Sequence, residues 1–432
     1  MAKEKFKSAD DVAAEYMELQ LSKSRESRFE NILVTVLTVG FVFIFAIAFW
    51  LLPDRDFSEE ENRTLQAFPE FELEGFLHGD FTADFGTYMA DQFPLRNFFI
   101  GVKAISETAQ LKGQNNDVIL GADGYLIARS DYPDEGILSQ NIENAGKFIS
   151  VAEENGIDCT AAFAGRKMDV LEDKLPALYG SYYSDRIFGI LDGMCEQNGF
   201  DYVNLRDALI AADKEGLYYK TDHHWTSLGA YYAYCEIVES MGITPYALSD
   251  FEIEAASDDF FGTTWSSAGV KWTEGDTIEY FRWEGDENLT LRIKNSSYDY
   301  KKSEKIEENG VKYDVFETVY VREMLEKKDK YASFAGGNNN SYVEITMEGE
   351  NIKERETLVL LRDSFADSLA PFLARHFDLV LIDLRTSTPD TIAIAKELGA
   401  ERILLLYNME TLTTTNDLKN LNFKLSSHKI QK

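Results

Sequence analysis

Cysteine is scarce in this chain of 432 residues, which contains only Cys159, Cys195 and Cys235. Each of the three lies in an apolar stretch, and no pair has the spacing of metal ligands. An odd and sparse set of cysteines does not build a disulfide framework, so we interpret them as small core residues. The sequence therefore indicates neither a disulfide-stabilised protein nor a cysteine-ligated metal protein, and we expect no bound cofactor.

Positive charge is also in short supply, since 43 lysines and arginines stand against 75 aspartates and glutamates. The resulting net charge of −32 would repel the phosphates of nucleic acid, which excludes nucleic acid as an expected partner. The excess of acid is otherwise typical of a soluble surface. An apolar fraction of 44% is that of a folded protein, and the length fits one large domain or two ordinary ones.

One segment contains no charge at all, namely residues 31–53, "NILVTVLTVGFVFIFAIAFWLLP". It is long enough to cross a bilayer as a helix, and longer than the apolar core of a cleaved signal peptide. We therefore predict an uncleaved anchor. Basic side chains precede it and mostly acidic ones follow it, so the positive-inside rule predicts a cytoplasmic tail over residues 1–30. The chain after Asp54 is then expected outside the cytoplasm.

Residues 54–115 have a mostly helical pattern with a break at Pro94. The stretch "NDVILGADGYLIA" that follows predicts a β-hairpin, with its turn between Gly121 and Gly124. From this hairpin onward we expect one domain over residues 116–432.

Within that domain, helix-like and strand-like segments alternate. The strand candidates are nearly continuous in apolar residues, which is typical of a parallel sheet covered by helices on both faces. The expected fold class is therefore α/β, with functional sites beyond the carboxyl ends of the strands. Residues 250–345 interrupt the alternation, and their composition predicts a largely β insertion that covers one end of the sheet. The expected strands are 158–164, 200–205, 357–361, 378–384 and 402–408, and the expected helices are 141–156, 184–199, 227–242, 366–376 and 389–399.

Ser364 follows the strand candidate "TLVLLRD" and opens a helix candidate. The free N–H groups and the dipole of a helix's first turn favour an anion nearby, which suits a nucleophilic serine and its oxyanion hole. Serine is also a preferred N-cap residue, so this stretch alone favours a purely structural role.

Two of the five histidines stand side by side in "KTDHHWTSLG". If this stretch is extended, Asp222 and His224 lie on one side and His223 points the other way. Asp222 can then hold one nitrogen of His224 and leave the other free as a base. One alternative is a polar pair before a helix capped by Thr226 or Ser227. Another is a metal site formed by Asp222, His223 and His224, although metal sites usually draw on three or more ligands and the chain has no further His or Cys cluster.

The motif "TDHHW" resembles the signature of the DHHW protein family, which is similar to the periplasmic alginate O-acetyltransferase proteins and to the SGNH hydrolase superfamily. Further blocks resemble that family in the same order: "DRDFSEEENRTLQAFPEF", "DQFPLR", "VILGADGYLI", "YASFAGGNNN", "LLRDSFADSLAPFLARHF" and "LIDLR". The resemblance implies an SGNH hydrolase-like sheet and a triad of Ser364, His224 and Asp222. Two features depart from the wider superfamily and look like features of the DHHW branch. Arg362 replaces the glycine of "GDS", and the Asp–His spacing is two rather than three.

Candidate oxyanion donors are the side chain of Asn338, in "GGN", and the backbone N–H of Ser364 or Phe365. The run "GGNNN" would equally form a turn.

Arg385 and Asn408 follow two other strands and are candidates for holding a substrate, although an ordinary solvated role fits each equally well. Trp225 is a candidate for shaping an acyl or sugar pocket, and packing at the start of the helix is its alternative role.

The resemblance implies a membrane-anchored extracytoplasmic O-acetyltransferase that acts on an exopolysaccharide or a cell-wall glycan. In the related systems a membrane-bound O-acyltransferase supplies the acetyl group, so such a partner is implied as well. A carbohydrate acetylesterase with the same triad is an alternative, and so is a non-catalytic glycan-binding or assembly protein. The strong acidity mildly disfavours a polyanionic acceptor such as alginate.

Overall fold

The computed structural model describes residues 9–58, 60–61, 63–130, 132–177, 179, 182–349 and 355–429. These residues form two compact units. The smaller contains the described residues up to Ser58 together with Arg63–Ile100, and the larger contains almost everything from Gly101 onward. The domain boundary at residue 115 that we predict from the sequence stays a prediction.

The smaller unit is mostly helical. Its first helix, α1 (Ala9–Leu51), includes a stretch over Arg28–Leu51 that is long and apolar enough to cross a membrane, with a mean hydropathy of 2.8. Length and composition are the grounds for this assignment, and the orientation of the helix stays a prediction. The other elements of this part of the chain are β1 (Phe57–Ser58), β2 (Arg63–Thr64), α2 (Leu73–His78), α3 (Asp80–Asp91) and α4 (Arg96–Ala109).

The predicted helix break and the predicted hairpin are both present. Helix α3 ends before Pro94 and α4 begins after it. The hairpin consists of β4 (Val118–Leu120) and β5 (Leu126–Ala128), which pair antiparallel with Val118 opposite Ala128. Its turn is a short 3-10 segment, and Gly124 there has a φ of +81°, which glycine adopts without strain. A short strand, β3 (Gln114–Asn115), adds to the other side of β4.

The larger unit is built on a nine-stranded sheet with the order β11-β12-β10-β13-β15-β14-β16-β6-β7. Five strands form the parallel part that the sequence predicts: β15 (Asp378–Asp383), β14 (Thr357–Arg362), β16 (Arg402–Asn408), β6 (Asp158–Ala164) and β7 (Tyr202–Asn204). The other four strands are antiparallel: β10 (Leu289–Lys294), β11 (Glu304–Glu308), β12 (Val311–Phe316) and β13 (Tyr342–Met347).

The region between residues 250 and 345 is rich in strands, as predicted, but most of it does not cover an end of the sheet. Strands β10 to β13 instead continue the sheet sideways from β15, so the sheet is mixed rather than wholly parallel. A separate antiparallel pair, β8 (Glu252–Phe260) with β9 (Asp276–Arg282), precedes them, and the short helix α10 (Thr263–Ala268) lies between these two strands in the chain.

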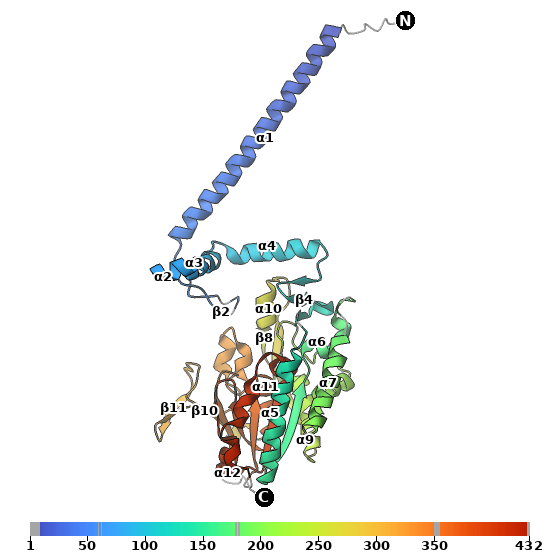
Figure 1. The fold of residues 1–432 in the computed structure, drawn as a ribbon, viewed down its shortest axis with the longest axis vertical. Helices are drawn as coiled ribbons and strands as arrows, with labels where there is room; N and C mark the ends of the chain where they lie inside the picture. The colour runs from blue at the N-terminus through green and yellow to red at the C-terminus, as the bar shows by residue number, and fades with distance from the viewer. Residues whose placement is uncertain are drawn as a thin grey trace. The chain divides into compact units, whose positions relative to one another are not determined.

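Helices cover both faces of the parallel strands (Figure 1). Successive side chains of a strand point to opposite faces, so Val359 and Leu361 of β14 pack in one core while Leu358 and Leu360 pack in the other. The first core is completed by α5 (Glu135–Glu154), α7 (Tyr182–Gln197), α12 (Thr391–Leu398) and α13 (Met409–Thr414). The second is completed by α8 (Leu205–Ala212), α9 (Ser227–Ser240) and α11 (Phe365–Leu373). Because both faces of these strands are buried, their sequences are nearly continuous runs of apolar residues.

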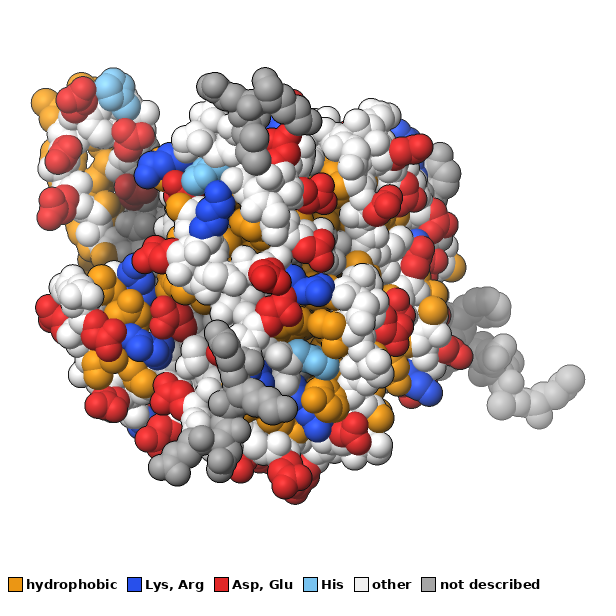
Figure 2. Space-filling view, turned by 90° about the horizontal axis from the view of Figure 1, so that it is seen from below, with side chains coloured by type: hydrophobic (Ala, Val, Ile, Leu, Met, Phe, Trp, Pro, Cys, Tyr) orange, Lys and Arg blue, Asp and Glu red, His pale blue; other side chains and the backbone are white. Residues whose placement is uncertain are grey.

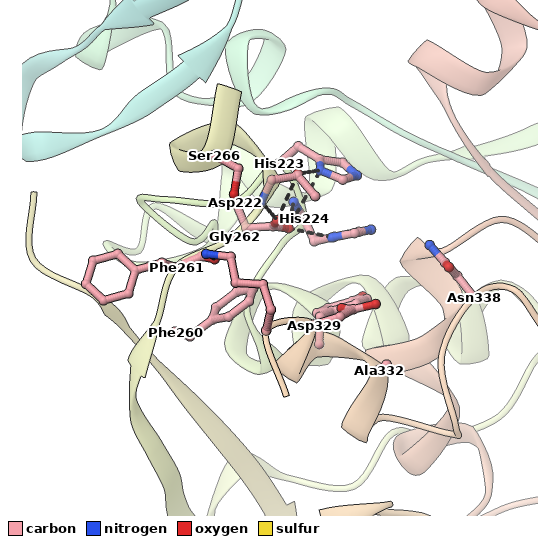
Figure 3. Close-up of a pocket in the computed structure, with 13 residues that line it drawn as sticks. Asp222, His223, His224, Phe260, Phe261, Gly262, Ser266, Asp329, Ala332 and Asn338 are labelled. Carbon is pink, nitrogen blue, oxygen red and sulfur yellow. Dashed lines mark hydrogen bonds and ion pairs between the residues drawn. The ribbon is translucent and has the colours of Figure 1, made fainter. Parts of the chain in front are cut away.

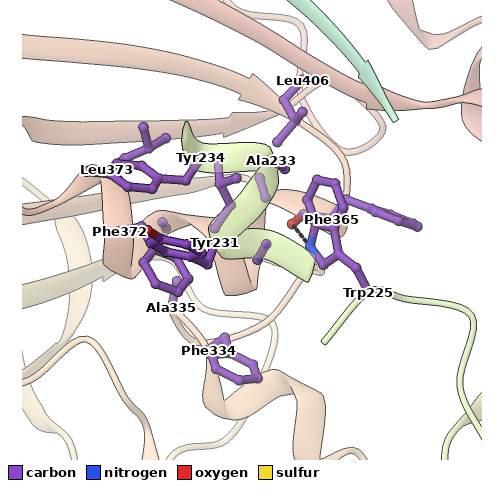
Figure 4. Close-up of a cluster of buried hydrophobic side chains, with 14 of the residues drawn as sticks. Trp225, Tyr231, Ala233, Tyr234, Phe334, Ala335, Phe365, Phe372, Leu373 and Leu406 are labelled. Carbon is purple, nitrogen blue, oxygen red and sulfur yellow. Dashed lines mark hydrogen bonds between the residues drawn. The ribbon is translucent and has the colours of Figure 1, made fainter. Parts of the chain in front are cut away.

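Helices α9 and α11 pack directly on each other through aromatic rings (Figure 4). Tyr234 stacks on Phe372 with ring centroids 5.6 Å apart, and Trp225 meets Phe365 edge to face at 4.9 Å. The indole Nε1–H of Trp225 also donates a hydrogen bond to the Phe365 carbonyl oxygen, at 3.1 Å. This contact joins the chain just before α9 to the start of α11, the two segments that carry the histidine pair and Ser364.

The excess of acid is dispersed over the surface. In the view of Figure 2, acidic side chains are spread among neutral ones, with basic and hydrophobic side chains between them. This distribution fits the solubility role that the composition indicates.

Candidate active site

Three parallel strands end at the same edge of the sheet, and each is followed by a polar residue that the sequence singles out. Strand β14 leads to Ser364, β15 leads to Arg385, and β16 ends at Asn408. The carboxyl edge of a parallel sheet is where α/β proteins form their sites, and the sequence predicts the site there.

Ser364 does not act as a helix cap, although its position would allow it. Its side chain makes no capping hydrogen bond, and the nearby Asp363 accepts the Phe365 backbone N–H at 3.0 Å instead. The second carboxylate oxygen of Asp363 accepts the backbone N–H and side-chain amide of Asn408, at 2.7 and 2.9 Å. Because Asp363 satisfies the helix start, the Ser364 hydroxyl remains available for another partner.

That partner is His224. The Ser364 Oγ lies 2.7 Å from Nε2 of His224, and Nδ1 of the same ring lies 2.6 Å from Oδ1 of Asp222. All three side chains are at least 95% buried. An imidazole that donates its Nδ1–H to a carboxylate presents Nε2 as an acceptor, so it can accept the serine hydroxyl proton. Asp222, His224 and Ser364 therefore form a continuous hydrogen-bonded line.

The carboxylate of Asp222 is held on both sides (Figure 3). Its Oδ1 also accepts the His224 backbone N–H at 3.1 Å, and its Oδ2 accepts the backbone N–H and hydroxyl of Thr263 at 2.8 and 3.0 Å. Burial alone would raise the pKa of Asp222, but the two neighbouring imidazoles and these hydrogen bonds hold it well below its ordinary value. Asp222 is therefore an ionised acceptor that orients His224.

The loop that carries Asp222 is fixed by Asp276, at the start of β9. Asp276 accepts the backbone N–H groups of Lys220 and Thr221, each at 2.7 Å, and the Thr221 hydroxyl at 2.5 Å. Gly262 passes so close to Asp222 that a Cβ on it would overlap the carboxylate. Asp276, Thr263 and Gly262 are not predicted from the sequence, because they lie in the β-rich region and carry no recognisable motif.

Tyr331 supports the other side of His224. Its ring stacks on the imidazole with centroids 4.0 Å apart and an interplanar angle of 6°. Its hydroxyl donates to the backbone carbonyl oxygen of Ser364 and can accept the Ser368 hydroxyl hydrogen, both at 3.0 Å. One side chain thus orients the ring of His224 and the backbone of Ser364. Tyr331 belongs to the "YASF" block, but the sequence pattern did not distinguish it from the core aromatics.

His223 does not turn away from the site as the alternation of an extended strand predicts. Its ring lies 3.8 Å from that of His224, its side chain is 41% exposed, and its Nδ1 lies 2.8 Å from the Thr263 hydroxyl oxygen. Burial, and then the neighbouring His224, lower the pKa of His223.

The donor atoms that a metal site would need come within 4.8 Å of one another in Asp222, His223 and His224. Most of these atoms are already engaged. Both nitrogens of His224 and both oxygens of Asp222 have hydrogen-bond partners. The Thr263 hydroxyl donates to Asp222, so His223 must donate its Nδ1–H to Thr263, which leaves only its Nε2 free for a metal. The hydrogen-bonded arrangement therefore fits acid–base chemistry better than metal ligation.

Two hollows meet at His223. A cleft of about 440 Å³ is lined by Ser364, Arg385 and Asn408, among others. A smaller recess of about 70 Å³ is lined by Asp222, His224, Tyr331 and Asn338, and Figure 3 shows Asn338 across it from the Asp222–His224 pair.

The three candidate binding residues have different surroundings. The Arg385 guanidinium is paired with Asp383 and donates to the Asn338 carbonyl oxygen at 2.9 Å. The Asn408 side chain is engaged at both polar atoms, because its oxygen caps α13 and its nitrogen donates one hydrogen bond to Asp363. The expectation that Trp225 shapes a pocket is wrong, since its side chain is 0% exposed and lines neither hollow. Its alternative role, packing at the start of α9, is the one observed.

The candidate oxyanion donors are reduced to two. The Phe365 N–H is taken by Asp363. The Ser364 N–H and the side-chain amide of Asn338 have no hydrogen-bond partner among the described residues. Ser364 lines the larger cleft, and Asn338 lines the smaller recess beside His224.

Arg362, the residue that replaces the usual glycine, is completely buried. Its guanidinium pairs with Asp367 of α11 at 2.7 Å, with both side chains 0% exposed, and extends to the Gly337 and Asn340 carbonyl oxygens at 3.4 Å. The arginine therefore links the serine-bearing helix to the loop that carries Asn338.

With this geometry established, comparison with known proteins identifies the region. Residues 183–383 match the DHHW protein family. The resemblance to the DHHW family is therefore confirmed. The match spans the histidine pair and Ser364, and it begins within α7 of the larger unit. No curated protein sequence matches the chain.

Solved structures share the fold of the DHHW region. A DHHW family protein from Eubacterium siraeum is 20% identical, with a TM-score of 0.55, covering 72% of this chain and 96% of that protein. PatB1 from Bacillus cereus, solved with a sulfonyl adduct, is 16% identical with a TM-score of 0.54, covering 69% of this chain and 98% of that one. The O-acetyltransferase domain of AlgJ from Pseudomonas putida is more distant, with 13% identity, a TM-score of 0.44, and coverage of 72% and 99%. The expected α/β fold class is confirmed, with the antiparallel extension as its departure from a purely parallel sheet.

Proposed function

We propose that the chain is a serine-dependent O-acetyltransferase that moves acetyl groups onto a glycan. The observation that carries the proposal is the line of hydrogen bonds from Asp222 through His224 to Ser364, at 2.6 and 2.7 Å. This arrangement has the parts of an activated nucleophile, namely a serine, a base within hydrogen-bond reach and a carboxylate that orients the base.

In the proposed reaction, Ser364 Oγ attacks the carbonyl carbon of an acetyl donor while Nε2 of His224 takes the hydroxyl proton. The donor's C–O bond breaks, and His224 returns the proton to the departing oxygen. A sugar hydroxyl then gives its proton to His224 and attacks the acetyl-serine, and Ser364 leaves with that proton. Asp222 remains ionised throughout and stabilises the imidazolium. The Ser364 N–H and the Asn338 amide are the proposed donors to the oxyanion.

The proposal extends to the place of the chain in the cell. The helix over Arg28–Leu51 would anchor the protein, with the tail before it in the cytoplasm and the DHHW region outside. A membrane-bound O-acyltransferase is the proposed source of the acetyl group, as the family resemblance implies. Water in place of the sugar would turn the same machinery into an acetylesterase, the main alternative.

The test is to incubate the full chain with an acetyl ester and to locate the adduct by mass spectrometry. We expect an increase of one acetyl group on the peptide that contains Ser364, and none in Ser364→Ala. Ser427→Ala is a matched control, because Ser427 lies outside both hollows and bonds only the Lys424 carbonyl oxygen. Acetylation that persists in Ser364→Ala would contradict the covalent mechanism.

Adding a glycan separates transfer from hydrolysis. An acetylated glycan supports the transferase, whereas release of free acetate without glycan acetylation supports the esterase. A chain that forms no acetyl-serine but binds the glycan would be a binding protein.

A further inference from the structure

The basic side chains of the cleft beside Ser364 are all engaged by groups of the protein itself. Arg385 is paired with Asp383 at 2.6 Å, and Arg166 is paired with Asp169 at 2.8 Å, where Asp169 is 0% exposed. Lys167 is buried, and its ammonium group donates to two backbone carbonyl oxygens, at 2.7 and 3.3 Å. The basic groups of this wall therefore attract an anionic ligand only weakly.

The acidic side chains of the same cleft are exposed. Glu410 lies in the first turn of α13 and is solvent-accessible. The Asp117 side chain is 83% exposed, and its nearest basic partner, Arg129, is 3.9 Å away. Other polar side chains that line the cleft carry hydroxyl or amide groups: Asn116, Thr264, Ser267, Thr411, Thr414 and Thr415. The open wall thus combines hydrogen-bonding groups with two exposed carboxylates, those of Glu410 and Asp117.

We infer that this cleft accepts an uncharged, hydroxyl-rich glycan and rejects a polyanionic one such as a uronate polymer. Carboxylates and threonine hydroxyls can accept hydrogen bonds from sugar hydroxyls, whereas a carboxylated sugar would place like charges beside Glu410 and Asp117. The inference concerns the class of glycan that the cleft binds. It rests on the proposed function only in that the bound glycan is taken to be the acetyl acceptor. Binding of the glycan can be measured without any turnover.

The experiment compares two ligands that differ only at C6 of each sugar, a galacturonic acid trimer and its carboxyl-reduced, neutral counterpart. Binding of each to the full-length Ser364→Ala protein in detergent is followed by NMR saturation transfer. We expect the neutral trimer to bind at least about tenfold more tightly at an ionic strength of about 0.01 M, where screening is weak. The preference should decrease at about 1 M salt, because the repulsion is then screened.

Glu410→Lys, made in the same Ser364→Ala background, should reduce the preference several-fold or reverse it. Glu154→Lys makes the same charge change at the end of α5, at the opposite edge of the sheet and outside both hollows, and should leave the preference unchanged. Equal or tighter binding of the uronate trimer, or no binding of the neutral trimer, would overturn the inference. Loss of the proposed function would be recognised separately, by the absence of acetyl-serine in the protein that retains Ser364.

Discussion

Replacing each of the paired histidines separately distinguishes a triad from a metal site. In the structure only His224 is hydrogen-bonded to both Asp222 and Ser364, whereas His223 contacts the His224 ring and is hydrogen-bonded to Thr263. A triad therefore predicts unequal effects. A metal site formed by Asp222, His223 and His224 predicts that both histidines matter comparably.

The expected magnitudes follow from these contacts. His224→Ala removes the base, so it should reduce the rate of acetyl-ester turnover by roughly 10⁵- to 10⁶-fold, as Ser364→Ala does. The double variant should lose little more, because triad members act as a unit. His223→Ala removes one hydrogen bond, from its Nδ1 to Thr263, that supports the position of Asp222. A hydrogen bond contributes about 1 kcal/mol, which corresponds to about a fivefold loss of rate.

Turnover of a chromogenic acetyl ester should be measured for the wild type, both single histidine variants and the double variant, with and without EDTA. His78→Ala is the control, since this histidine lies at the end of α2 and lines neither hollow. Equal losses at His223 and His224, together with loss of activity in EDTA, would refute the reasoning. The hydrogen-bonded line would then describe only the metal-free arrangement.

Arg362→Met should destabilise the fold by about 3–5 kcal/mol, because it leaves Asp367 buried without its partner. Burial raises the pKa of Asp367 to about 7. Adding Asp367→Asn removes the unpaired carboxyl group and should restore most of the lost stability in urea denaturation. The absence of any recovery would contradict this explanation. The pKa of Asp222 in the folded protein lies well below its ordinary value of about 3.9, so the ionised carboxylate stabilises the fold at pH values above about 3.9. This contribution is lost as the pH falls through the pKa of the folded state. A ¹³C NMR titration should therefore find Asp222 ionised at about pH 4, and protonation above that pH would contradict this assignment. For the anchor, protease added to spheroplasts should digest the DHHW region and spare the N-terminal tail, whereas digestion of the large region only after lysis would indicate the opposite orientation.

The parallel half of the fold could be predicted because its sequence signals are local. Strand β14 is apolar at consecutive positions, since Leu358 and Val359 face different cores, and this pattern is typical of a strand buried on both faces. The helix that begins at Ser227 follows a Thr226 that caps it through the Gly229 N–H. Such features depend on neighbours within a few residues, which a sequence pattern contains.

The antiparallel extension and the support of the site could not be predicted in the same way. The pairing of β13 with β15 joins Tyr342 to Ile382, and no local pattern specifies which edge of the sheet a strand will join. The same limit applies to Tyr331, whose stacking on His224 joins residues more than a hundred positions apart. The sequence predicted which groups would meet at the site, but not the side chains that hold them in place.

The position of β14 in the sheet has a consequence for the order in which the protein matures. Both neighbours of this strand, β15 and β16, come after it in the chain, so the strand that carries Ser364 has no partner until residues 378–408 have been made. The segment with Asp222 and His224 is synthesised well over a hundred residues earlier, so it is present before the strand that carries Ser364 can pair. A nascent or truncated chain that ends before residue 378 therefore contains all three groups of the site but cannot align them. Reactivity towards acetyl esters should appear only when the last strand pairs, which makes it a reporter of completed folding.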